Sequence, residues 1–124
     1  MILDMHVLLG RWPFAPLQYD TVDGVLELLD RVGIDVAVVT SLNSVFYYDC
    51  EIGNREVGQA CAQHPDRFVP FVVLNPHLLL WKEHLRECLD AYGVKGIKLH
   101  PDYHKYSLLD DVAAEVMAEA RRLN

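Results

Sequence analysis

The sequence has few cysteines, and they form no pattern that would bind zinc or build a disulfide framework. Its three cysteines, Cys50, Cys61 and Cys88, are far apart, odd in number and include no CxxC pair. Disulfide-rich secreted domains and zinc ribbons need paired cysteines at short, regular spacings. The sequence therefore predicts neither, and a reducing cytoplasm is the compartment that fits it.

Basic stripes and long hydrophobic runs are also missing. Eighteen acidic residues against eleven Lys and Arg give a net charge of -7, and the basic residues form no cluster that could follow a phosphate backbone. No apolar run approaches the ~20 residues of a membrane-spanning helix, and no basic leader precedes the first apolar segment. The sequence thus predicts a soluble cytoplasmic protein that binds neither nucleic acid nor membrane.

Four short runs rich in Val, Ile and Leu alternate with four segments of helical period. The expected strands cover residues 2–8, 35–41, 68–74 and 94–100, and the expected helices cover 22–32, 51–63, 81–92 and 109–120. This alternation is typical of successive βαβ units around a parallel sheet. The chain has 124 residues, about half of the roughly 250 that a closed eight-stranded barrel takes.

The first expected strand carries an Asp and a His two residues apart. Alternation along a strand puts Asp4, His6 and Leu8 on one face and the residues between them on the other. If that face lines a barrel interior, Asp4 and His6 can present a pair of metal ligands. The alternative is a buried His6 that hydrogen-bonds to Asp4 and fills space.

The fourth expected strand repeats this arrangement with Lys98 and His100 facing the interior. Lysine is rarely buried unless it is paired, so an inward Lys98 calls for an acidic partner, a substrate anion or a chemical role. The alternative is a lysine that extends to the rim of the sheet and pairs with an acid there. We predict Lys98 and His100 as catalytic or substrate-binding groups.

The connections that follow the strands are longer than those that follow the helices. They carry Arg11, Trp12 and Asn43, along with several aromatic residues. In parallel α/β folds these loops form the functional face. We therefore predict that Arg11, Trp12 and Asn43 contact a substrate.

Three segments resemble the amidohydrolase-related family. They are Asp4-Met5-His6, residues 64–71 continuing to Asn75-Pro76, and residues 96–106, of which the last is the most specific. The resemblance implies that residues 1–124 are the N-terminal half of a partial (β/α)8 TIM barrel, an α/β fold of four parallel strands alternating with four helices. It also implies a metal-dependent hydrolase or decarboxylase acting on a small carboxylated or cyclic compound.

The same resemblance implies one divalent metal, often zinc, with Asp4 and His6 as its ligands, and it places Tyr103 and His104 beside the substrate. The chain departs from the family at position 8, because the family pattern is Asp-x-His-x-His and Leu8 cannot coordinate a metal. Two further family ligands, a His on the fifth strand and an Asp on the eighth, have no counterpart in these residues. We therefore expect weak metal binding and an inactive isolated chain.

Two functions remain open from the sequence. One is a family hydrolase or decarboxylase that becomes active when a second half is supplied, and the other is a non-catalytic ligand-binding or interaction module with a degraded metal site. Half a barrel leaves the outer edges of the first and fourth strands unpaired, and free edges tend to pair with another chain. We expect self-association or completion by a second half-barrel.

Overall fold

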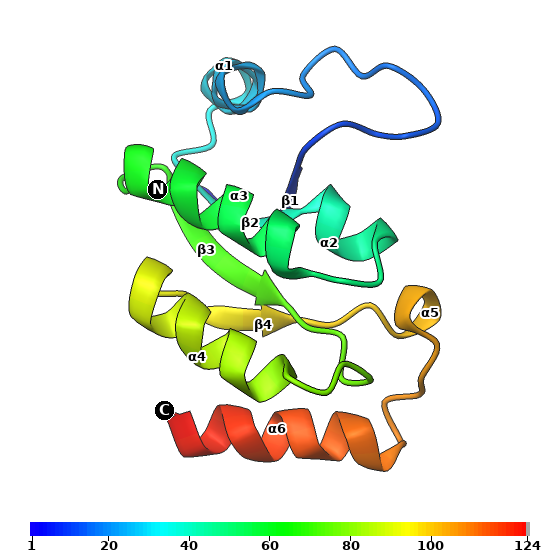
Figure 1. Ribbon diagram of the computed structural model, residues 1–124. Helices are drawn as coiled ribbons and strands as arrows, with labels where there is room; N and C mark the ends of the chain where they lie inside the picture. The colour runs from blue at the N-terminus through cyan, green and yellow to red at the C-terminus, as the bar shows by residue number, and fades with distance from the viewer. Residues whose placement is uncertain (124) are drawn as a thin grey trace.

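Four parallel strands form one sheet in the computed structural model, which describes residues 1–123 (Figure 1). The strands are β1 (Leu3–Leu9), β2 (Val36–Ser41), β3 (Phe68–Val73) and β4 (Gly96–Lys98), and they lie side by side in sequence order. Each neighbouring pair is parallel. The predicted fold class, an α/β half-barrel, is confirmed.

Four long helices follow the strands and cover one face of the sheet (Figure 1). They are α1 (Val22–Val32), α3 (Glu51–Gln63), α4 (Trp81–Tyr92) and α6 (Asp111–Leu123). The helices α1 and α4 end at Gly33 and Gly93, which adopt the left-handed conformation that a glycine C-cap allows. The first three helices have the predicted bounds, and α6 begins two residues later than predicted.

Two short helices were not predicted from the sequence. The helix α2 (Leu42–Phe46) begins directly after β2, where the Ser41 side chain accepts a hydrogen bond from the Asn43 backbone N–H. The helix α5 (Pro101–His104) has a proline in its first turn, a position that suits the fixed φ of proline. Because α5 starts so early, β4 ends at Lys98 and is shorter than the predicted strand over residues 94–100.

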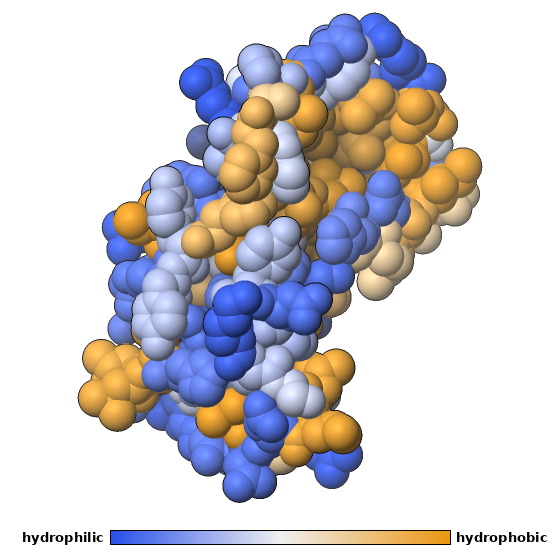
Figure 2. All heavy atoms as spheres, turned by 90° about the vertical axis from the view of Figure 1, so that its right-hand side faces the viewer, coloured by the Kyte–Doolittle hydropathy of each residue, from blue (hydrophilic) through white to orange (hydrophobic). Residues whose placement is uncertain are grey.

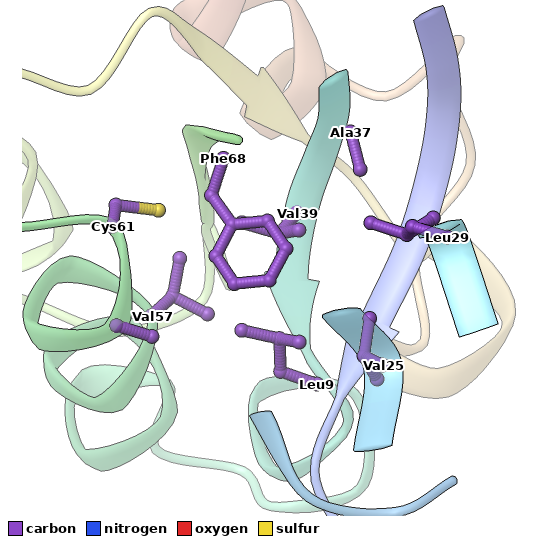
Figure 3. Packing of buried hydrophobic residues seen from close by; sticks show 9 residues of the cluster. Leu9, Val25, Leu29, Ala37, Val39, Val57, Cys61 and Phe68 are labelled. Carbon is purple, nitrogen blue, oxygen red and sulfur yellow. The ribbon is translucent and has the colours of Figure 1, made fainter. Parts of the chain in front are cut away.

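The hydrophobic core lies between the sheet and the helices in two clusters. The first joins β1, β2 and β3 to α1 and α3, and Figure 3 shows Leu9, Val25, Leu29, Val39 and Phe68 in contact there. The second joins β3 and β4 to α4 and α6 and consists of Val72, Leu74, Trp81, Leu85, Cys88, Val94 and Val116. Within residues 1–123 both clusters therefore lie between the long helices and the same face of the sheet.

The strands β2 and β3 part halfway along, and a buried asparagine takes the place of β2. Their pairing ends at Pro70, whereas β3 pairs with β4 only from Phe71 onward. At the end of β3 the amide of Asn54, from α3, accepts a hydrogen bond from Val73 N (2.9 Å) and donates one to Val73 O (2.8 Å). Buried backbone groups need such partners, so Asn54 completes the ladder that β2 leaves open.

Candidate functional site

The carboxyl ends of all four strands lie on one side of the molecule, on the right in Figure 1. The loop from β1 to α1, the short helix α2 and the short helix α5 surround this end (Figure 1). Figure 2 looks onto it and shows hydrophobic atoms gathered on its upper right, beside a more hydrophilic lower part. In parallel α/β folds this is the end where ligands bind.

A β-bulge in β1 breaks the simple alternation that we expected for Asp4 and His6. Asp4 is in register with Ala37 and Val7 with Val39, so β1 has one residue more than β2 in this interval. Ala37 and Val39 both belong to the helix-facing core. The register position of Asp4 is therefore on the helix side. Asp4 meets His6 by accepting a hydrogen bond from the His6 backbone N–H through Oδ1 (2.8 Å).

His6 contacts Lys98 across the sheet, although 92 residues separate them in the sequence. Lys98 Nζ lies 2.8 Å from His6 Nδ1. An ammonium group can only donate hydrogen bonds, so Nδ1 accepts and the His6 ring proton sits on Nε2. Among residues 1–123 no carboxylate lies within 4.0 Å of Lys98 Nζ.

His100 and His104 extend this group toward α5. Their ring centroids are 6.3 Å apart. His100 is half-buried, and no described residue supplies a hydrogen-bond partner for its Nε2. Burial, together with a smaller repulsion from the neighbouring His104, Lys98 and His6, lowers the pKa of His100 to about 4. His100 is therefore an uncharged imidazole at neutral pH.

His104 is buried beneath α2. Its side chain is only 3% exposed, its Nε2 donates to Ser44 O (3.2 Å), and its Nδ1 has no partner in the described chain. Burial lowers the pKa of His104, and the hydrogen bond to the Ser44 carbonyl opposes that lowering. The hydrogen bond to Ser44 thus fixes the His104 ring between α5 and α2.

The loop residues that we predicted as substrate contacts lie apart from the Lys98 group. Arg11 is exposed and its Nε is 3.6 Å from Asp20 Oδ2. Asn43 donates to Glu56 Oε2 (2.8 Å). Both residues line a cavity of about 470 Å³ between the β1–α1 loop and α3, on the helix side of β1 and β2. The structure therefore does not bring Arg11 and Asn43 together with Lys98.

Trp12 and Tyr103 belong to an aromatic cluster over the strand ends. Trp12 packs edge-to-face against Phe46 at 5.4 Å between centroids, and Tyr103 packs against the same ring at 5.3 Å. Tyr103 also lies 6.5 Å from His100, so this cluster adjoins the imidazole group. Sequence reasoning missed Phe46 as the centre of the cluster, because the helix that presents it was not expected.

The three cysteines take no part in this site. All are buried and free, and burial raises the pKa of Cys50 and Cys61 to about 12 and that of Cys88 to about 11. A thiol with such a pKa is not a nucleophile at neutral pH.

No helix within residues 1–123 has the length and hydrophobicity that a membrane crossing requires.

The described residues do not by themselves form a metal centre. Within residues 1–123 no three His, Cys, Asp or Glu side chains lie close enough together to hold an ion. His6 Nδ1 is occupied by a lysine cation, and a neighbouring cation disfavours metal binding electrostatically. Val7 and Leu9 pack in the helix-facing core, so Leu8 between them faces the opposite side and offers no ligand atom there.

Residues 4–124 match the amidohydrolase family, and no curated protein matches the chain. Among solved structures, an amidohydrolase II structure has a TM-score of 0.77 at 17% identity, with 96% of this chain and 46% of that chain covered.

Two decarboxylase structures are also similar. The 2,6-dihydroxybenzoate decarboxylase from Rhizobium has a TM-score of 0.69 at 19% identity, covering 99% of this chain and 48% of that chain. A 5-carboxyvanillate decarboxylase from Novosphingobium aromaticivorans, with bound manganese, has a TM-score of 0.67 at 18% identity over 79% of this chain and 31% of that chain. At these identities the likeness shows the fold. The chain spans less than half the length of each of the three structures.

Proposed function

Since this chain belongs to the amidohydrolase family, we propose that it is one half of a barrel enzyme that hydrolyses or decarboxylates a small carboxylated or cyclic compound. The observation that carries the proposal is the position of Lys98. Its cation lies at the strand ends beside His6, and no carboxylate of the described chain neutralises it. A half-buried cation gains from an anionic partner, and a substrate carboxylate supplies one.

The imidazoles beside Lys98 have the properties of acid–base groups. His100 is uncharged at neutral pH and its Nε2 has no partner within residues 1–123. A neutral imidazole can accept a proton at Nε2 or hydrogen-bond a substrate oxygen. We propose that Lys98 holds the carboxylate, His100 exchanges the proton and Tyr103 packs against the ring of the compound. His104 then acts by holding α2 and α5 together.

A divalent cation is part of this proposal, since the decarboxylase from Novosphingobium aromaticivorans binds manganese. That relative gives no support to zinc in particular. His6 is the ligand that we propose from this half, because the register of β1 places Asp4, the other predicted ligand, on the helix side of the sheet. When bound, such a cation polarises a substrate oxygen or activates water. Residues 1–123 do not by themselves form a complete metal centre, so this proposal requires further ligands from outside them.

A ligand-binding module without chemistry is the second candidate. Leu8 at a ligand position and the lack of a three-ligand cluster within residues 1–123 favour it. Both candidates predict carboxylate binding at Lys98. Release of carbon dioxide or of a hydrolysis product in the presence of Mn²⁺, by a form of the protein that includes the second half of the barrel, would support the enzyme, whereas binding without product by that same form would support the module.

Calorimetric titration tests the Lys98 subsite. We expect 2,6-dihydroxybenzoate to bind more tightly than resorcinol, which lacks the carboxylate. We also expect Lys98→Met to weaken binding of the acid by about 10- to 100-fold, because a hydrogen bond to a charged group contributes about 1.5–3 kcal/mol. Lys82→Met is the matched control, since Lys82 pairs with Glu115 on the helix layer. Equal binding by Lys98→Met and the unaltered protein would refute the proposal.

A further inference from the structure

We infer that Phe46 is a positioning residue of the strand-end site, which fixes the β1–α1 loop on one side and α5 on the other, so that the site prefers flat rings to puckered ones. The inference deepens the proposed function and rests on it, because it concerns the part of the compound beyond the carboxylate at Lys98. Three features of the fold lead to it: the packing around the Phe46 ring, the few other attachments of the loop, and the support of α2.

The first feature is the central place of the Phe46 ring among its aromatic neighbours. Its centroid lies 5.4 Å from that of Trp12, 5.7 Å from that of Phe14 and 5.3 Å from that of Tyr103, with interplanar angles of 71°, 83° and 87°. These are edge-to-face contacts, which the charge distribution of aromatic rings favours. The helix α2 lies between the β1–α1 loop and α5 (Figure 1). Among the aromatic pairs of residues 1–123, Phe46 is the ring that joins this loop to α5.

The second feature is that the β1–α1 loop has few other attachments. The loop covers residues 10–21, and no backbone hydrogen bond within residues 1–123 joins residues 12–18 to a strand or a helix. Tyr19, near the far end of the loop, packs under a guanidinium of α1. The near end is held where Trp12 and Phe14 pack on each other and on α2. Loops with few contacts open easily, so the position of this segment depends on its aromatic packing.

The third feature is the rigid support of the helix that carries Phe46. Leu42 and Val45 are buried beneath α2. The Ser44 carbonyl accepts a hydrogen bond from His104 Nε2 (3.2 Å), which attaches α2 to α5. A hydrogen bond and an aromatic contact thus join these two short helices. The Phe46 ring therefore stands on a fixed base, from which it can hold the more weakly attached loop.

The aromatic cluster begins next to the cation of the proposed site. Tyr103 is 53% exposed, and its ring centroid lies 6.5 Å from that of His100, which follows Lys98 by two residues. A flat ring can stack on an aromatic side chain or meet it edge to face, whereas a puckered saturated ring has no such electrostatic preference. Lys98 then selects a compound by its charge, and Trp12 and Tyr103 select it by its ring. Phe46 acts through these two side chains.

Calorimetric titration with benzoate and cyclohexanecarboxylate tests the selection, since both acids carry one carboxylate on a six-membered ring. We expect the unaltered chain to bind benzoate about 3- to 10-fold more tightly. Phe46→Leu should bring this ratio close to 1, and Phe46→Tyr, which keeps the ring, should preserve it. Tyr47→Leu is the matched control, because Tyr47 is 59% exposed and belongs to no aromatic pair of residues 1–123. It should keep the ratio of the unaltered chain.

Acrylamide quenching of tryptophan fluorescence tests the position of the loop without any ligand. The chain has two tryptophans, and Trp81 is only 6% exposed, so quenching reports mainly on Trp12. Phe46→Leu should raise the quenching constant about twofold, because the loop loses its anchor. Phe46→Tyr and Tyr47→Leu should leave it unchanged. Circular dichroism shows whether each variant is folded.

The failures of the two proposals give different results. Lys98→Met should weaken both acids by the same factor and keep their ratio, and equal binding by this variant and the unaltered chain would refute the proposed function. A Phe46→Leu variant that keeps the benzoate preference, or that leaves Trp12 quenching unchanged, would overturn the role of Phe46 alone. Because quenching needs no ligand, it decides whether Phe46 holds the loop even when neither acid binds.

Discussion

At the scale of single residues, position 8 decides what β1 can offer to a metal. The bulge between Asp4 and Val7 resets the alternation of the strand, so that Val7 and Leu9 pack under the helices and Leu8 faces the other way. His6 lies on that other side too, where it meets Lys98. A ligand at position 8 would therefore stand on the same face as His6.

We predict that Leu8→His increases the affinity of the chain for Mn²⁺ by about 10-fold or more. Even a residue that only hydrogen-bonds to a metal ligand typically changes the metal affinity by about 10- to 100-fold. Titration calorimetry of the variant and the unaltered chain measures the difference. Val32→His is the control, because it adds a histidine at an exposed position at the end of α1, away from β1. Equal gains at positions 32 and 8 would contradict the assigned direction of Leu8.

Part of the site could be predicted from residue spacing and part could not. Alternation on the short fourth strand correctly separates Ile97 and Leu99, which pack toward α4, from Lys98, which reaches His6. Alternation fails on the first strand, because nothing in the local sequence marks the extra residue of the bulge. The burial of His104 could not be predicted either, because it depends on a contact with Ser44 that forms only in the folded chain.

At the scale of elements, the junction of α3 with β3 depends on one amide. Asn54 satisfies both backbone groups of Val73, and the Ser44 hydroxyl and His84 Nε2 lie at 3.4 and 2.8 Å from its amide. Gly53 beside it has no side chain, and a Cβ there would lie 2.2 Å from Ser44 Oγ. The close approach of α2 and α3 to the end of β3 therefore requires these two neighbours together.

We predict that Asn54→Leu lowers the free energy of unfolding by about 2–4 kcal/mol, because it leaves a buried N–H and a buried C=O without partners. Urea denaturation measures this loss, and hydrogen exchange at the Val73 amide should speed up in the same variant. Asn43→Ala is the control, since the Asn43 side chain bonds to Glu56 near the surface, and it should cost much less. A similar cost for both variants would argue against the role of Asn54.

The long helices and the strands can be predicted from the hydrophobic periodicity of the sequence, because each of them buries a whole apolar face. The short helices α2 and α5 cannot be predicted in this way, because five and four residues are too few to show a helical periodicity. They form because Ser41 caps one and Pro101 begins the other. These two helices carry Phe46, Tyr103 and His104, so the unpredicted elements are those that shape the strand ends.

At the scale of the whole molecule, acid should weaken the fold through His100. Its pKa is about 4 in the folded chain, against about 6.5 in an unfolded one. Above pH 6.5 both states are neutral and this group adds no pH dependence. As the pH falls from 6.5 to 4, only the unfolded chain takes up the proton, so stability declines, and below 4 the decline from this group stops.

We predict that this decline amounts to roughly 2 kcal/mol after allowance for the partial exposure of the ring. Urea denaturation at pH 7 and pH 4.5 measures it, at one fixed protein concentration. On acidification, the free energy of unfolding of His100→Asn should fall by about 2 kcal/mol less than that of the unaltered chain. The ring can also be titrated directly by NMR, and a midpoint near pH 6.5 for His100 would contradict the prediction.

The direction of the strands also bears on how a longer gene could arise. β1 begins and α6 ends on the same side of the molecule, opposite the strand ends that carry the site (Figure 1). Within the chain, residues 33–35 suffice to connect the end of α1 to the start of β2. Duplication of the coding sequence in tandem would join α6 to the next β1 by the same kind of short connection. Fusion of two such units then needs no rearrangement of the fold.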